Sequence, residues 1–238
     1  MSVQSVHQFA EKVALVTDGA NEIGRAVALQ LALQGCYVVV GFSQENEREK
    51  SALAELQNLG TLAHAVETDC STVKGARNLV DAVEKIYGRL DLLVNCLKFR
   101  GDSTFDEIDE TAWMQTVDAN LKATFFVTQT AVKLMSARPK AAIVNVVSDC
   151  AADEKDLAFA ATQASIINLT KNLATQLKPK FRVNAVTVGE SNRRAIENLD
   201  AELFRPASGI IADDAARAVL FLLSSEAVAL NGQVLKVE

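Results

Sequence analysis

The chain has 238 residues, 49% of them hydrophobic, which is typical of one α/β domain around a single core. The formal net charge of -6, with no basic run, argues against nucleic acid and against an anionic membrane surface as partners. No apolar run approaches the roughly 20 residues that a membrane-spanning helix needs, so no membrane segment is expected.

The N-terminal segment lacks both the basic start and the apolar stretch of a secretion signal. We expect residues 1–11 to form a loose arm and residues 12–238 to form a single domain of a cytoplasmic protein. The cysteines show no C-x-x-C spacing, and the chain has only 2 histidines, so we expect reduced thiols and no metal. These cysteines are Cys36, Cys70, Cys96 and Cys150.

Apolar, β-branched runs alternate with segments of helical period along the chain, which is typical of βαβ units around a parallel sheet. The pattern predicts a doubly wound, Rossmann-like α/β fold with a seven-stranded parallel sheet and helices on both faces. The expected strands lie near 12–17, 36–42, 62–67, 91–95, 141–147, 181–187 and 233–237. The expected helices lie near 22–34, 46–59, 72–87, 111–137, 156–178 and 213–223.

The predicted helices at 111–137 and 156–178 are long for such a fold and carry apolar residues on more than one side. Phe125, Phe126 and Val127 cannot all face one sheet, and the same holds for the pair Ile166 and Ile167. We interpret this surplus of apolar surface as a subunit interface. A locally thick core is the alternative.

Six segments carry characteristic residues in a fixed order and spacing. Together they resemble the short-chain dehydrogenase/reductase family from Lys12 onward, most closely its ketoacyl-reductase-like members. The segments are Lys12–Thr17, Leu92–Asn95, Val117–Leu121, Ile143–Ser148, Phe181–Val186 and Gly232–Val237. The resemblance implies the same doubly wound fold, and function has to be argued from the site residues.

In this family a loop of the form T-G-x-x-x-G-x-G binds the pyrophosphate of the cofactor at a helix N-terminus. Here the corresponding segment runs from Thr17 to Gly24 and keeps only the last of the three glycines, Gly24. Asp18 and Glu22 replace the other two, and carboxylates near a pyrophosphate repel it. Glu22 is further predicted to take the place of a phosphate at the helix start, with an ordinary first-turn acid as the alternative.

Two further cofactor positions of the family also map onto the chain. Asn95 begins the segment that corresponds to N-N-A-G, where we expect Leu97 and Lys98 to fill the space beside the adenosine ribose. Asp69 matches the aspartate that contacts adenine, although a turn-forming aspartate is an equal alternative. The resemblance therefore implies that this chain binds no cofactor itself.

Catalysis in the family uses a Y-x-x-x-K motif in the helix after the fifth strand. Phe159 and Gln163 stand at those two positions, so neither the proton donor nor the positive charge remains. Asn120 and Ser148 match the two other catalytic positions. Their structural alternatives are an asparagine bonded to a neighbouring backbone carbonyl and a strand-end serine that caps a turn.

These substitutions predict a catalytically inactive subunit that pairs with a homologous active dehydrogenase through the helices at 111–137 and 156–178. NAD would then be bound by the partner. The chain resembles the degenerate subunits of such heteromers, for example that acting on hydroxy(phenyl)methyl-succinyl-CoA, which implies a hydroxyacyl-CoA type of substrate. The alternatives are a divergent, active NAD(P)-dependent oxidoreductase and a ligand-sensing pseudoenzyme that uses the segment 190–209, with Arg193 and Arg194.

Overall fold

The computed structural model describes residues 8–43, 47–58, 63–101, 103–137, 141–150, 155–189 and 210–237. Its strands form one seven-stranded sheet in the order β3-β2-β1-β4-β5-β6-β7, and every neighbouring pair is parallel. The strands are β1 Val13–Thr17, β2 Tyr37–Phe42, β3 Ala63–Glu67, β4 Leu92–Asn95, β5 Ala141–Asp149, β6 Phe181–Gly189 and β7 Val234–Val237. The predicted fold class is confirmed, and the strand order reverses between β1 and β4, the point where such sheets bind ligands.

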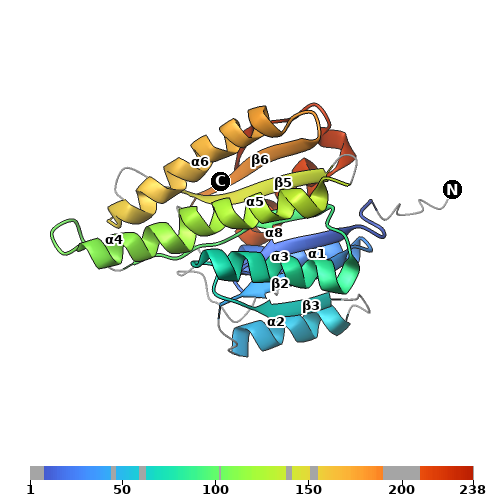
Figure 1. Cartoon of the computed structure of the whole chain (residues 1–238), viewed down its shortest axis with the longest axis horizontal. Helices are drawn as coiled ribbons and strands as arrows, with labels where there is room; N and C mark the ends of the chain where they lie inside the picture. The colour runs from blue at the N-terminus through green and yellow to red at the C-terminus, as the bar shows by residue number, and fades with distance from the viewer. Residues whose placement is uncertain are drawn as a thin grey trace.

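The helices cover both faces of the sheet (Figure 1). α1 and α8 pack on one face of the sheet, over one apolar cluster. α3, α5 and α6 pack on the other face, over a second apolar cluster. The α-helices are α1 Glu22–Leu33, α2 Glu47–Asn58, α3 Val73–Tyr87, α4 Glu110–Val117, α5 Ala123–Met135, α6 Leu157–Leu177 and α8 Ile210–Leu223. A π-helical turn, η1 Asp118–Lys122, joins α4 to α5, and a short 3-10 turn, η2 Ser225–Ala227, follows α8.

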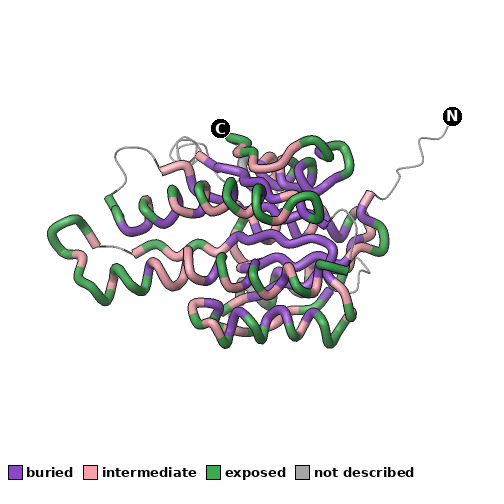
Figure 2. The backbone as a smooth tube through the Cα atoms, turned by 45° about the horizontal axis from the view of Figure 1, so that its top comes forward, coloured by how far each residue is buried: buried purple, intermediate pink, exposed green. Residues whose placement is uncertain are grey.

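The centre of the sheet is buried on both sides (Figure 2). All residues of β1 and β4 are buried, as parallel strands covered by helices require. The core also includes Phe9, which is 0% exposed although it falls within the predicted loose arm. Residues 1–7 lie outside the described part of the chain. None of the helices that the structure describes is long and apolar enough to cross a membrane.

Two predicted elements differ from the structure in ways that affect the site. The helix predicted at 111–137 is interrupted by η1, because the side chain of Asn120 turns inward to bind the loop after β4. β5 runs on to Asp149, so Ser148 is its last residue but one and lies opposite Val188.

Candidate functional site

In the turn between β1 and α1, a residue other than glycine takes a backbone conformation that favours glycine. Asp18 adopts the left-handed conformation with φ of 51°, which aspartate tolerates better than most residues. The side chain of Asn21 then caps α1, since its Oδ1 accepts a 2.8 Å hydrogen bond from the amide of Gly24. Its Nδ2 donates to the carbonyl of Cys96 at 3.0 Å, which ties this turn to the loop after β4.

Gly24 is required by packing. A Cβ at this position would lie 2.4 Å from the carbonyl oxygen of Asp18, far inside contact distance. Glu22 is exposed in the first turn of α1, and the described acceptor of the Gly24 amide is Asn21. The prediction that Glu22 substitutes for a bound phosphate is therefore wrong, because Asn21 occupies the helix amide.

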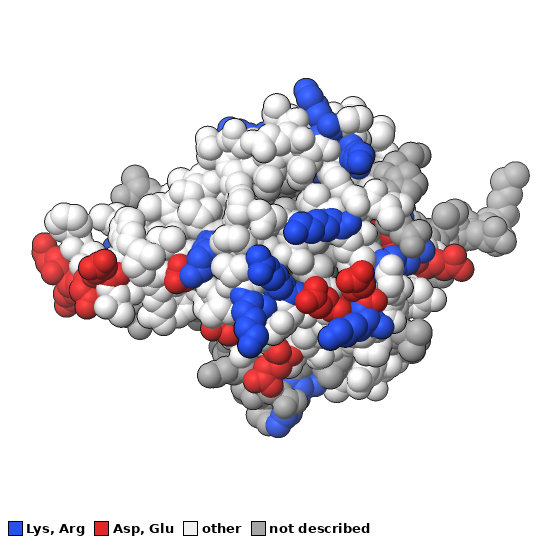
Figure 3. Space-filling model, in the orientation of Figure 1, with Lys and Arg blue, Asp and Glu red and all other residues white. Residues whose placement is uncertain are grey.

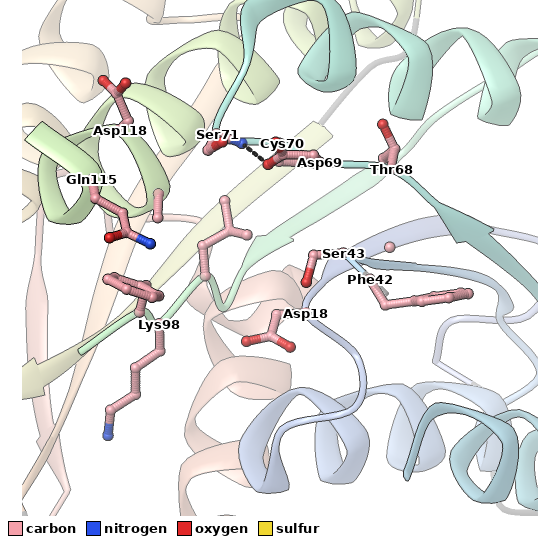
Figure 4. Close-up of a pocket in the computed structure, with 14 residues that line it drawn as sticks. Asp18, Phe42, Ser43, Thr68, Asp69, Cys70, Ser71, Lys98, Gln115 and Asp118 are labelled. Atoms are coloured by element: carbon pink, nitrogen blue, oxygen red, sulfur yellow. Dashed lines mark hydrogen bonds between the residues drawn. The ribbon is translucent and has the colours of Figure 1, made fainter. Parts of the chain in front are cut away.

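A pocket of about 420 Å³ lies at the carboxyl ends of β1, β2, β3 and β4 (Figure 4). Leu97 and Lys98, which follow β4, are among the residues that line this pocket. The carboxylate of Asp18 and the hydroxyl of Ser43 face each other across it (Figure 4). Its volume suits a ligand of drug size.

Three acidic residues line the pocket. They are Asp18, Asp69 and Asp118, and Asp118 is paired with Lys122 at 2.6 Å. Asp69 forms a turn, since its Oδ1 accepts the amide of Ser71 at 2.9 Å, as its structural alternative predicted. Burial, followed by the charges of Asp69 and Asp18, raises the pKa of the pocket-lining Cys70 thiol to about 12. This environment disfavours another negative charge.

Asn95 lies in a buried hydrogen-bond ladder and not among the pocket-lining residues. Its Nδ2 donates to Thr128 Oγ1 at 3.0 Å and to Asn145 Oδ1 at 2.8 Å. Asn145 in turn donates to Thr170 Oγ1 at 2.8 Å, so the ladder links β4, β5, α5 and α6. We assign Asn95 to the positioning of these elements.

Asn120 clamps the loop that follows β4. Its Oδ1 accepts the amide of Phe99 at 2.8 Å, and its Nδ2 donates to the Phe99 carbonyl at 2.7 Å. The same Nδ2 donates to the carbonyl of Thr116 at 3.0 Å, which is the neighbouring-carbonyl contact given as its structural alternative. Both polar atoms of this buried amide are thus used within the fold.

Gln163 is brought together with Ser148, and Phe159 lies one helical turn before Gln163 on α6. Phe159 is 0% exposed, at the start of α6, where Asp156 caps the helix by accepting the Phe159 amide at 2.9 Å. Gln163 is also buried, and its Oε1 accepts a 2.9 Å hydrogen bond from the backbone amide of Ser148. Neither side chain can exchange a proton in the physiological pH range.

Two cations over the Phe159 ring were not predicted. The guanidinium carbon of Arg100 lies 4.6 Å from the ring centroid, and Lys98 Nζ lies 6.0 Å from it. Both belong to the loop after β4, far from Phe159 in the sequence. Lys98 and Arg100 alternate with Phe99, and this alternation is the sequence feature that could have indicated that the two cations lie on one side of the loop.

The comparisons with known proteins agree along most of the chain. The 3-oxoacyl-(acyl-carrier-protein) reductase FabG of Staphylococcus aureus is 30% identical, with 95% of this chain and 96% of that protein covered. The 7alpha-hydroxysteroid dehydrogenase of Bacteroides fragilis is 29% identical, covering 98% of this chain and 95% of that protein. A short chain dehydrogenase from Burkholderia cenocepacia J2315, solved in complex with NADP, shares 28% identity and a TM-score of 0.85, covering 97% of this chain and 98% of that one.

The names of these relatives are those of a reductase and two dehydrogenases, and the solved one shares the fold of this chain. The sequence model of the family described as short chain dehydrogenase matches residues 12–202. The chain therefore belongs to the short-chain dehydrogenase family.

Proposed function

We propose that this chain is a non-catalytic member of the family that assembles with an intact, NAD-binding paralogue acting on a hydroxyacyl substrate. The observation that carries the proposal is the buried pair at the catalytic position. Phe159 offers no hydroxyl, and Gln163 is held by the Ser148 amide without a charge. Proton transfer by a positioned side chain contributes about 10²–10⁴-fold in rate, and this pair cannot supply it.

The fold family implies a nicotinamide dinucleotide, and the residues at its phosphate end do not fit one. The Gly24 amide that would face a pyrophosphate is bound by Asn21. Asp18 lines the adjacent pocket, so a phosphate would meet a carboxylate where the family has only backbone. Each such repulsion costs on the order of 1 kcal/mol in a water-like dielectric and more when partly buried.

The surface of α5 and α6 supports a partner subunit. α6 contains 21 residues, among which Lys171 is the only charged one, and in α5 the only charged residue is Lys133. Figure 3 shows few charges over α6, whereas charges gather over α3. Phe125, on α5, is 37% exposed, although Val127 and Ile166 turned out to be buried. A helix pair so poor in charge is typical of the centre of an interface.

Co-expression with an intact family member encoded nearby, followed by native mass determination, tests the assembly. We expect a mixed oligomer, and we expect Phe125→Glu to dissociate it by placing a charge within the interface. The matched control is Leu33→Glu, which changes an exposed leucine at the end of α1 on the other face of the sheet. Recovery of homo-oligomers alone, or equal effects of the two variants, would contradict the proposal.

A second candidate function is an active, divergent NAD(P)-dependent oxidoreductase. The named relatives favour it, because each carries the name of an oxidoreductase, and so does the open pocket of about 420 Å³ at the switch point. Ser148 stands at the family's catalytic serine position, where its amide is bound by Gln163, so this candidate predicts turnover that falls strongly in Ser148→Ala. The isolated chain should be assayed with NADH and NADPH on a 3-oxoacyl thioester. Turnover that depends on Ser148 would favour this candidate. Background rates in both the wild type and Ser148→Ala would favour the non-catalytic subunit.

A third possibility, ligand sensing through the segment 190–209, falls on residues outside the described part of the chain.

A further inference from the structure

The turn before β7 contains the pair Asn231 and Gly232, and Asn231 is the only asparagine in the sequence that a glycine follows. Gly232 adopts a φ of 75°, in the left-handed region that glycine favours, and both residues are partly exposed. A glycine has no Cβ to shield its amide nitrogen, so this nitrogen can attack the side-chain carbonyl carbon of a preceding asparagine. The turn therefore places a chemically reactive pair at the edge of the sheet.

Hydrogen bonds hold both reactive groups in place in the folded chain. The Oδ1 of Asn231 accepts the amide of Val183 at 2.8 Å, and its Nδ2 donates to the carbonyl of Ala174 at 2.9 Å. The amide of Gly232 donates to the carbonyl of Val183, also at 2.8 Å. The nitrogen that would attack and the carbonyl group that it would attack are thus both engaged. Attack requires these bonds to open first, so Asn231 is protected while the turn is closed.

Two further bonds, both from the buried side chain of Asn184, fasten the same turn to β6. Its Nδ2 donates to the carbonyl of Leu230 at 3.0 Å, and its Oδ1 accepts the amide of Gln233 at 2.9 Å. We call residues 230–233, with their bonds to β6 and α6, the C-terminal clasp. The strand that follows, β7, is the last of the sheet, and none of its residues is buried. Because such segments open locally more often than a core does, we expect the clasp to open without global unfolding.

We propose that Asn231 is a deamidation site whose reaction is controlled by opening of the C-terminal clasp. In the open clasp the Gly232 nitrogen gives up its proton to solvent and attacks the side-chain carbonyl carbon of Asn231. A carbon–nitrogen bond forms, the side-chain amide leaves as ammonia, and a five-membered succinimide ring results. Water then adds to one of the two ring carbonyls and opens the ring to aspartate or isoaspartate. Water is consumed and ammonia released, with no change of oxidation state.

Neither product can rebuild the clasp. An aspartate at 231 has no N–H to donate, so the Ala174 carbonyl loses its donor. Its carboxylate would lie near the last turn of α6, where the helix dipole disfavours negative charge. An isoaspartate adds a carbon to the main chain, which displaces β7 from its register against β6. The turn also packs closely on α6, since a Cβ built on Gly232 would lie 3.3 Å from Ala174 Cβ. The modification therefore releases β7 irreversibly.

Incubation of the full chain at mildly alkaline pH, followed by peptide mass mapping over several weeks, tests the site. We expect deamidation at Asn231, and we expect Asn184→Ala to raise its rate about tenfold, because two bonds that close the clasp are lost. Asn172→Ala is the matched control, since it removes an exposed asparagine whose bonds remain within α6. It should react at Asn231 as the wild type does.

If Asn184→Ala folds poorly, the wild type in urea below its unfolding transition decides, because local opening should already speed the reaction there. Hydrogen exchange then measures the release: the β7 amides should exchange faster in Asn231→Asp than in the wild type, and Asn172→Asp should leave them unchanged. No product at Asn231, equal rates in the Asn184 and Asn172 variants, or a rate that rises only with global unfolding would overturn the inference. The inference is independent of the proposed function, since it uses none of the cofactor or catalytic positions.

Discussion

Gln163 Oε1 accepts a 2.9 Å hydrogen bond from the backbone amide of Ser148. The bond joins α6 to β5 at the position where the family carries its lysine, and it leaves Gln163 3% exposed. A lysine that assists catalysis has to keep its ammonium near the cofactor, whereas this glutamine serves the fold. The exchange of a catalytic role for a structural one at residue 163 leads to the first prediction.

Gln163→Lys should lower the free energy of unfolding by about 3 kcal/mol, because it buries an ammonium and removes the acceptor of the Ser148 amide. Gln163→Met, which removes only the acceptor, should cost about 1–2 kcal/mol. Urea unfolding of both variants measures the difference. A lysine variant as stable as the wild type would show that residue 163 has room for a charge.

Gly24→Ala should destabilise the protein by about 2–3 kcal/mol, because the new Cβ would lie 2.4 Å from the Asp18 carbonyl oxygen. The gain in helix propensity, about 1 kcal/mol, does not offset this overlap. Gly88→Ala is the control. Gly88 has a φ of 63°, and a Cβ built on it would have no neighbour within 4 Å among the described residues other than those next to it in the chain, so this substitution should cost only the conformational strain, about 1 kcal/mol. Equal melting temperatures for the two variants would argue that the β1–α1 turn relaxes freely.

The pH dependence of stability should show the buried thiol of Cys36. Burial, followed by the charge of Asp91, raises its pKa from 9.0 to about 12. Because the folded pKa lies above the unfolded one, the stability contributed by Cys36 is fully present below pH 9.0 and is lost as the pH rises to about 12. Within that window the loss is about 1.4 kcal/mol per pH unit. Cys36→Ala should therefore lose less stability than the wild type between pH 9 and 11, and parallel curves would contradict the assignment.

The fold followed from the sequence because local signals and packing agree. Thr72 and Gly88 bound α3, since the first caps its start and the second takes the left-handed conformation at its end. The pairing of Phe159 with Gln163 also followed, because residues four apart share one face of a helix.

The site could be predicted only in part. Asp18 adopts the left-handed conformation because the β1–α1 turn requires it. Aspartate permits this conformation but does not dictate it, so the sequence alone does not predict it. The position of Arg100 over Phe159 depends on the path of a loop held by Asn120 and Asp156, which are distant in the sequence. Leu97 lines the pocket for the same reason. Tertiary contacts of loops, unlike periodic patterns, leave no local signal.

Titration of the isolated chain with NADH and NADPH, followed by nicotinamide fluorescence, tests the central proposal most directly. We expect no saturable change up to about 1 mM, the upper end of ordinary enzyme affinities. The double variant Asp18→Gly/Glu22→Gly should bind better than the wild type, because both carboxylates near the phosphate position are removed. Saturable binding of either cofactor to the wild type at micromolar concentration would contradict the account.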